Sequence, residues 1–86
     1  MRLNQDYILR NFAGQYYLFS FSEVPSSDTV IPLSETAAWI WSALEAGMQR
    51  DKIASRMTEE YEVDRVTAEE AVRWFLDALT EKGILI

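Results

Sequence analysis

The side chains of this sequence that could do chemistry are mainly carboxylates. The 86 residues include no Cys and no His, which removes thiolate nucleophiles, imidazole bases and the usual zinc ligands. The acidic residues gather between positions 59 and 70: Glu59, Glu60, Glu62, Asp64, Glu69 and Glu70. A general acid needs a dry pocket to raise its pKa, whereas these residues lie in polar runs. The pattern indicates solvated helix ends, and we predict that the protein is not an enzyme.

Metal and cofactor sites have no signature in this sequence. No stretch has the ligand spacing of an EF-hand loop. The three glycines, Gly14, Gly47 and Gly83, are dispersed, so they form no glycine-rich loop that could cradle a phosphate. We therefore predict neither a metal nor a cofactor.

The charge balance argues against nucleic acid as a partner. Fourteen Asp and Glu residues outnumber eight Lys and Arg residues, which gives a formal net charge of −6. Such a chain repels a phosphate backbone. No run of about 18 apolar residues could span a membrane, and the first residues do not form a signal peptide. We therefore expect a cytoplasmic protein that binds neither nucleic acid nor a membrane.

The elements that must position any site follow in a simple order, strands first and helices second. Eighty-six residues suffice for a single domain, residues 1–86. Aromatic and β-branched residues predict strands at 7–10, 16–21 and 29–33, with a turn at 11–15 and a polar loop at 22–28. Apolar residues at intervals of three and four then predict three helices. The expected fold is α+β and winged-helix-like, a three-stranded antiparallel sheet followed by three helices.

Two features of the sheet can be predicted in more detail. In the second strand Tyr17, Phe19 and Phe21 share one face, and we expect this aromatic face to contact the helices. Pro32 has no N–H to donate to a neighbouring strand, so the third strand should not be central in the sheet. It should leave one edge open.

Capping residues mark the first helix, and an apolar stripe marks the second. Ser34 is the expected N-cap of the first helix, and Gly47 is placed to end it in a left-handed conformation. The second helix should cover residues 50–61, with Ile53 and Met57 in its apolar stripe.

The third helix has the clearest amphipathic pattern in the chain. Asp64 is the preferred N-cap, with Thr67 and Glu70 as an alternative capping box, and Gly83 ends the helix. Its apolar stripe consists of Ala68, Ala71, Val72, Phe75, Leu76 and Leu79. The apolar residues 84–86 should dock on the core as a short extended tail.

Two tryptophans lie at the flanks of the helical stripes. Trp39 and Trp74 are about 100° or more from the stripe centres. Each either packs against a neighbouring element or forms part of an exposed anchor surface for a partner. The sequence leaves both interpretations open.

The edge of the third strand is the strongest candidate for binding. Proteins commonly protect an edge by short length, proline or charge, and Asp28 and Pro32 fit that interpretation. Alternatively, a peptide adds to the edge as a further strand, with main-chain hydrogen bonds supplying affinity and apolar pockets supplying selectivity. A homodimer that pairs two such edges is a third alternative.

The order of elements is also that of a winged-helix transcription factor, in which a recognition helix enters the major groove of DNA. The third helix would be that helix. Its outward positions are Glu69, Glu70, Arg73, Asp77 and Glu81. One cation among four anions would be repelled by DNA, so this alternative is disfavoured.

Several segments resemble the PqqD family of peptide recognition domains. They are Leu33-Ser34-Glu35-Thr36-Ala37-Ala38-Trp39-Ile40-Trp41, residues 53–64, Val72-Arg73-Trp74-Phe75-Leu76 and Glu81-Lys82-Gly83-Ile84-Leu85. The resemblance covers residues 7–86. It implies three antiparallel strands followed by three helices, and a scaffold role in the biosynthesis of ribosomally made, modified peptides.

The resemblance also implies a site. The leader segment of a precursor peptide would pair with the backbone of the third strand, at Thr29, Val30, Ile31, Pro32 and Leu33. The third helix would wall the groove with Val72, Phe75, Leu76 and Leu79, and Arg73 at the rim would meet an acidic leader residue. Many relatives carry an Asp where this chain has Ala71. The implied partners are a precursor peptide and a modifying enzyme, such as a radical enzyme, a cyclase or a leader peptidase, and a lasso-type pathway fits the solitary domain.

Overall fold

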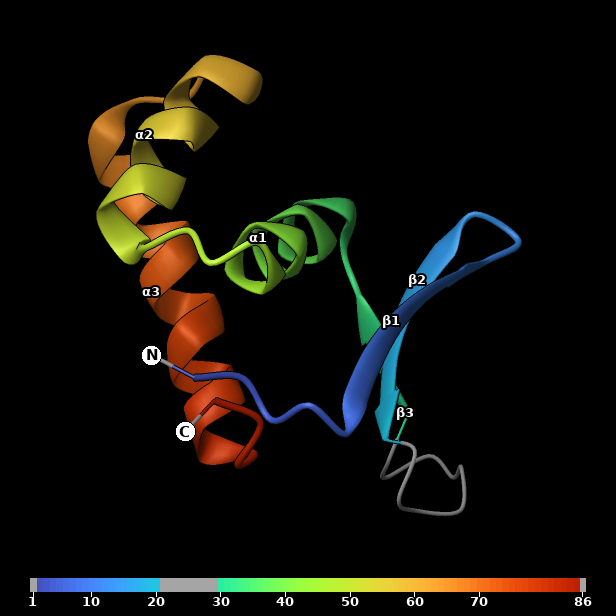
Figure 1. The fold of residues 1–86 in the computed structure, drawn as a ribbon. Helices are drawn as coiled ribbons and strands as arrows, with labels where there is room; N and C mark the ends of the chain where they lie inside the picture. Colours follow the sequence, from blue (N-terminus) through green and yellow to red (C-terminus); the bar gives the residue numbers. More distant parts are fainter. Residues whose placement is uncertain (1, 21–29, 86) are drawn as a thin grey trace.

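Three antiparallel strands followed by three helices make up the protein, which confirms the predicted α+β fold (Figure 1). The computed structural model describes residues 2–20 and 30–85. The elements are β1 (Tyr7–Phe12), β2 (Gln15–Ser20), β3 (Val30–Leu33), α1 (Glu35–Glu45), α2 (Arg50–Glu60) and α3 (Arg65–Glu81). The predicted loop at 22–28 lies outside the described residues.

A two-residue turn joins β1 to β2. Ala13 and Gly14 have φ angles of 54° and 84°, and positive φ at both positions matches the twist of the flanking strands. The side chain of Asn11 accepts a hydrogen bond from the Gly14 N–H at 3.2 Å. The turn is shorter than predicted, because Asn11 and Phe12 already pair with β2.

β3 lies at an edge of the sheet, as Pro32 predicted. The strand order is β1-β2-β3, and Pro32 lies opposite Tyr17 of β2. Within residues 2–20 and 30–85, β2 is the one strand with which β3 pairs.

The aromatic face of β2 points away from the helices, so the prediction for Tyr17 and Phe19 is wrong. Leu18 is fully buried and Ser20 is 5% exposed, whereas Tyr17 and Phe19 are half-buried on the opposite face. The reason is that the alternation defines two faces but not which of them α1 covers. α1 packs on the face of Leu18. The third residue of the predicted face, Phe21, lies outside the described residues.

The aromatic residues of β2 are instead partly buried by the side chains of their cross-strand neighbours. Phe19 lies opposite Ile8 of β1 and Val30 of β3, and all three side chains are half-buried. Such pairs on one face of a sheet stabilise it without a covering layer.

Side-chain caps begin two of the helices, as predicted. The Ser34 hydroxyl accepts a hydrogen bond from the Ala37 N–H at 3.1 Å, and the Asp64 carboxylate accepts one from the Thr67 N–H at 2.8 Å. Each bond satisfies a donor that the first turn of a helix leaves unpaired. The alternative start of α3 at Thr67 is therefore wrong.

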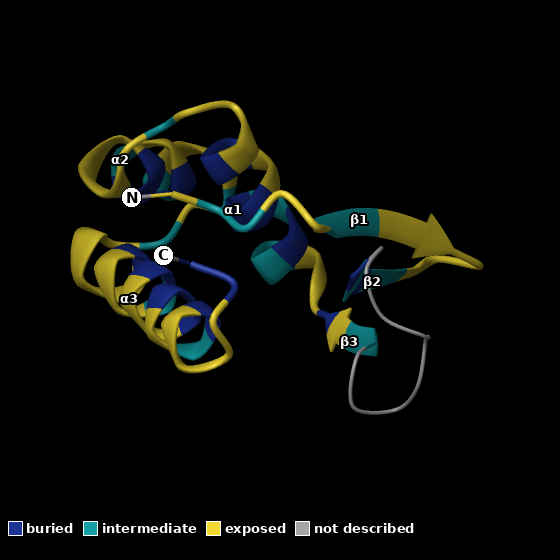
Figure 2. Cartoon of the chain, turned by 60° about the horizontal axis from the view of Figure 1, so that its bottom comes forward, coloured by how far each residue is buried: buried dark blue, intermediate teal, exposed yellow. Residues whose placement is uncertain are grey.

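The core lies between the three helices and the inner face of the sheet. Its largest fully buried side chains include Trp41 of α1, Ile53 and Met57 of α2, and Leu76 of α3. In Figure 2 the buried residues of the helices face inward, while exposed residues cover the outer side of α3. α1 stands between the sheet and the α2/α3 pair (Figure 1). None of the described helices is long and apolar enough to cross a membrane.

The two ends of the described chain meet. Ile84 and Leu85 are buried, which confirms the predicted docking for these two residues of the tail, and Ile86 lies outside the described residues. Leu3 forms an antiparallel bridge with Leu85, and the Asn4 N–H donates a hydrogen bond to the Ile84 carbonyl at 2.7 Å. This pairing was not predicted, because the first residues carry no strand pattern of their own.

Replacing Asp64 with Asn should remove part of the dependence of stability on pH. Hydrogen bonds from Thr67 hold the pKa of the Asp64 carboxyl below its ordinary value of 3.8. A group whose pKa is lower in the folded state contributes stability above its unfolded pKa and loses that contribution as the pH falls through its folded pKa. Urea unfolding followed by circular dichroism from about pH 5 to pH 2 should show a steeper loss in the natural protein than in Asp64→Asn, whose amide caps the helix without titrating.

Stability at pH 7 is the internal control for this variant. Asn is about as good an N-cap as Asp, so both proteins should unfold at similar urea concentrations there. Parallel pH profiles for the two proteins would contradict the role of Asp64 as a titrating cap.

Candidate functional site

A cleft separates the first turns of α1 from the middle of α3. We call it the α1/α3 cleft, and its volume is about 700 Å³. Its lining residues are Ser34, Thr36, Ala37 and Ile40 on one side, and Thr67, Glu70, Ala71, Arg73, Trp74, Phe75 and Asp77 on the other. The opening leaves room for side chains of a bound segment.

The lining of the cleft on α3 follows from helical periodicity. Thr67, Glu70, Ala71, Trp74 and Asp77 recur at intervals of three and four, so they share one side of the helix. This side lies next to the buried stripe, which faces the core. α3 therefore contributes one side to stability and a second side to the cleft.

The cleft combines an apolar floor with a polar mouth. Ile40 and Phe75 are buried at its base. Trp74 is 72% exposed at its mouth, where a partner could cover its ring. The charged lining residues are Glu70, Arg73 and Asp77, all exposed.

The edge of β3 leads directly into this cleft. Ser34, which follows the last residue of β3, is both the N-cap of α1 and a lining residue. A single residue, Ser34, connects β3 to α1, and Figure 2 shows how short this connection is. A strand edge and a side-chain cleft are therefore adjacent in the fold.

The structure places the predicted residues of β3 on both faces of the sheet. Ile31 lies opposite Leu18 on the inner face, and Val30 lies opposite Phe19 on the outer face. Both are half-buried, Pro32 is exposed and Leu33 belongs to the core. Thr29 lies outside the described residues.

The predicted residues of α3 divide between the core and the cleft. Val72, Leu76 and Leu79 are buried in the hydrophobic core and do not line the cleft, whereas Phe75 and Arg73 do line it. A peptide contact for the three core residues stays a prediction.

Sequence reasoning missed the whole α1 side and most of the α3 side of the cleft, since only Arg73 and Phe75 were predicted as site residues. Ala37, Ile40, Glu70, Ala71 and Asp77 line the cleft although none was predicted as a site residue. One signal in the sequence could have found them. Thr67, Ala71 and Trp74 are spaced by four and three residues, so they form a second line along the helix, beside the apolar stripe.

The two flanking tryptophans have different surroundings. Trp39 packs edge to face against Tyr61, with ring centroids 5.7 Å apart and planes at 88°. Burial, followed by the carboxylates of Glu35 and Glu60, raises the pKa of the Tyr61 hydroxyl above its ordinary value of 10.0. Trp39 thus has the packing role, and Trp74 has the exposed position of a contact residue.

Groups that could hold a metal ion do not converge in the described ranges. Among residues 2–20 and 30–85, no cluster of three or more Asp and Glu side chains is arranged for that purpose. The cleft is therefore characterised by its shape and its mixed apolar and polar lining.

Comparisons with known proteins find the same architecture in two solved structures. One is of TbiB1 in complex with the TbiA(beta) leader peptide: it is 29% identical, with a TM-score of 0.81, and the alignment covers 99% of this chain and 94% of that chain. The other is of a lasso peptide synthetase B1 complexed with the leader peptide: it is 27% identical, with a TM-score of 0.81, and the alignment covers 99% and 95%. No curated protein sequence matches significantly.

A family match covers most of the chain. The profile of the family described as coenzyme PQQ synthesis protein D matches residues 24–85, which include β3 and all three helices. This match confirms the resemblance inferred from the segments at 33–41 and 81–85. The chain belongs to the PqqD family.

Proposed function

We propose that this protein is a non-catalytic, single-domain module that binds the leader segment of a ribosomally made precursor peptide in the cytoplasm. The two solved relatives, similar over nearly the whole chain, contain a leader peptide. The observation that carries the proposal here is the edge strand β3, which leads directly into the α1/α3 cleft.

The backbone of β3 is suited to strand addition. In an antiparallel pair, main-chain groups of successive residues face the partner strand and the opposite edge alternately. Pro32 lacks an N–H, so it fits a non-hydrogen-bonded pair with Tyr17. In that register the carbonyls of Val30 and Pro32 and the N–H of Val30 face outward. A leader segment that pairs there receives one donor and two acceptors.

The α1/α3 cleft would then select side chains of the leader. An added strand presents alternate side chains to each face, and those on the inner side would reach toward Ala37 and Ala71, whose small side chains leave space in the lining. Trp74 at the mouth is suited to cover an apolar leader residue. Arg73 would meet an acidic one, between the carboxylates of Glu70 and Asp77.

The module would act by holding the leader while a modifying enzyme acts on the rest of the precursor. One relative is called a lasso peptide synthetase B1, which favours a lasso-type partner, such as a leader peptidase or a cyclase, over a radical enzyme. No residue of this chain is assigned a catalytic role in that scheme.

Binding to a labelled leader peptide, encoded beside this gene, tests the proposal. Fluorescence anisotropy should give saturable binding with a Kd of about 1 μM or lower, and a scrambled peptide should not bind. Double-stranded DNA should not bind even at low salt, because the exposed charges of α3 are mainly acidic, with Glu69, Glu70, Asp77 and Glu81 against Arg65 and Arg73. DNA binding without leader binding would replace the proposal with the transcription-factor alternative.

Replacing Val30 with Pro should weaken leader binding by about fivefold without unfolding the protein. The change removes one outward N–H, and a main-chain hydrogen bond contributes about 1 kcal/mol. It spares the inward groups of Ile31, which pair with β2 in the register described. Anisotropy gives the affinity, and circular dichroism checks the fold.

The matched control is Val30→Ala, which shortens the side chain and keeps the N–H. Its affinity should stay within about twofold of the natural protein, since the Val30 side chain lies on the outer face with Phe19. Equal losses in both variants would mean that the side chain, rather than the strand edge, contacts the leader. Light scattering at several concentrations checks that β3 is not occupied by a second copy of the chain.

Replacing Trp74 with Ala should weaken leader binding by about tenfold, because truncating an aromatic contact residue commonly costs more than 1 kcal/mol. The exposed position of Trp74 keeps the cost to folding small. Val66→Ala is the control: Val66 is 63% exposed on the same helix but does not line the α1/α3 cleft. If the two variants bind the leader equally well, the cleft does not contact it.

A further inference from the structure

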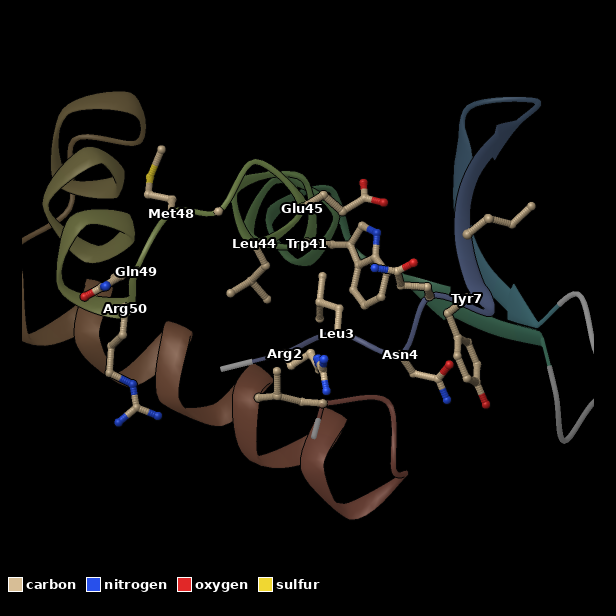
Figure 3. Close-up of a pocket in the computed structure, with 14 residues that line it drawn as sticks. Arg2, Leu3, Asn4, Tyr7, Trp41, Leu44, Glu45, Met48, Gln49 and Arg50 are labelled. Carbon is tan, nitrogen blue, oxygen red and sulfur yellow. The ribbon is translucent and has the colours of Figure 1, made fainter.

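A second cleft lies at the other end of α1, next to both ends of the described chain (Figure 3). We call it the terminal cleft, and its volume is about 790 Å³. Its lining residues are Arg2, Leu3, Asn4, Gln5, Tyr7, Ile8, Trp41, Leu44, Glu45, Gly47, Met48, Gln49, Arg50 and Leu85. None of them lines the α1/α3 cleft, so both clefts can be filled at once.

A buried hydrogen-bond donor without an acceptor lies in the wall of the terminal cleft. Trp41 is 1% exposed, and its Nε1–H has no hydrogen-bond partner. No other buried side-chain nitrogen or oxygen in the described part of the chain lacks a partner. A buried donor without an acceptor lowers the stability of the folded protein, because it has lost its hydrogen bonds to water. A ligand that supplies an acceptor would remove this penalty. This wall of the cleft therefore favours a ligand that carries an acceptor.

An exposed side chain lies one turn of α1 beyond this donor. Glu45 is exposed, and it follows Trp41 by one turn of α1. Figure 3 shows the Glu45 carboxylate on the side of the ring to which the indole nitrogen points. A small displacement of this side chain would give an acceptor access to the N–H.

The charges at the cleft differ from those of the whole chain. Among the described residues, Arg2 and Arg50 line it, against one carboxylate, Glu45. The acids that follow these segments in sequence, Asp6 and Asp51, do not line it. In a chain with a formal charge of −6, this local excess of cations favours an acidic ligand.

Apolar side chains make up part of the mixed lining of the cleft. Leu3, Leu44, Met48 and Leu85 contribute aliphatic surface around the Trp41 ring. Met side chains adapt to the shape of a bound group. One apolar side chain of a ligand can therefore be buried between the chain ends and α1.

These observations together define an occupant. We infer that the terminal cleft docks an acidic segment of a partner protein, which inserts one apolar side chain and places a main-chain carbonyl oxygen on the Trp41 Nε1–H. The carboxylates of the segment face Arg2 and Arg50. This surface is separate from the proposed leader site, and the inference does not depend on leader binding.

The experiment follows the indole N–H signal of Trp41 in nitrogen-15 NMR spectra of the full chain. The probe is the pentapeptide acetyl-Asp-Glu-Leu-Asp-Glu-amide. We expect a saturable shift of the Trp41 signal and no shift of the Trp74 signal, since Trp74 lies at the other cleft. The assignments come from Trp39→Phe and Trp74→Phe, which leave Trp41 in place.

Two further peptides separate the chemical contributions. The peptide with Ser in place of Leu tests the apolar side chain, and acetyl-Lys-Lys-Leu-Lys-Lys-amide tests the charge. Both should bind at least about threefold more weakly than the probe. Equal binding of all three peptides, or no response of the Trp41 signal in a folded protein, would overturn the inference.

Variants of the protein provide the matched tests. Arg50→Gln should weaken probe binding by about threefold, and Glu45→Gln should strengthen it by a similar factor. Arg56→Gln, an exposed cation of α2 that does not line the cleft, should have no effect. Losses of the same size in Arg50→Gln and Arg56→Gln would indicate general charge attraction and overturn the proposed docking.

The Trp41 hydrogen bond can be tested without leaving a cavity. Replacing Trp41 with 3-benzothienylalanine keeps the shape of the ring and substitutes sulfur for the N–H. Probe affinity should fall by about fivefold while unfolding in urea shows no loss of stability, because no bond within the protein is removed. Unchanged affinity in this variant would show that Trp41 donates no hydrogen bond to the ligand. The same titration with Val30→Pro should match the natural protein, so failure of one proposal does not affect the other.

Discussion

The burial of α1 is the constraint on which the rest of the structure depends. The sheet has little contact with α2 or α3, and α1 stands between them (Figure 1). Five of its eleven residues are buried: Ala38, Ile40, Trp41, Ala43 and Leu44. Because the edge strand β3 runs directly into this helix, the packing of α1 also sets the position of the strand edge relative to α3. A shift of α1 would therefore change stability and both clefts together.

Both clefts arise because a helix of eleven residues cannot be covered evenly along its length. The first turns of α1 face α3 across a gap whose lining includes the small side chains of Ala37 and Ala71. Its last turn faces the ends of the chain, where Leu3 and Leu85 come together. The buried middle of the helix separates these regions. A chain of 86 residues thereby carries two clefts that share no lining residue.

Much of the fold could be predicted because its signals are local. The caps at Ser34 and Asp64 each depend on a side chain and an N–H three residues away, and the edge position of β3 follows from the missing N–H of Pro32. The face of β2 that α1 covers is not a local property, since alternation is the same for Leu18 and Phe19. For that reason the aromatic residues were assigned to the wrong side.

The candidate site was less predictable for a related reason. Helical periodicity identifies the apolar stripe of α3, but it does not say where the core ends and an opening begins. Phe75 and Leu76 are neighbours in that stripe, yet only Phe75 of the two lines the α1/α3 cleft. The terminal cleft depends on contacts between residues more than 35 positions apart, such as Leu3 and Trp41, which no short motif reports.

The pairing of the two chain ends gives the molecule a mechanical property. Tension applied to both ends acts first on the Leu3–Leu85 bridge and on the hydrogen bond from Asn4 to Ile84. Breaking these two contacts would remove two walls of the terminal cleft and expose Ile84. Until they break, the β1–β2 hairpin and its turn would carry no load. A bulky group attached close to Leu3 or Leu85 would therefore adjoin the terminal cleft, which shares no lining residue with the α1/α3 cleft.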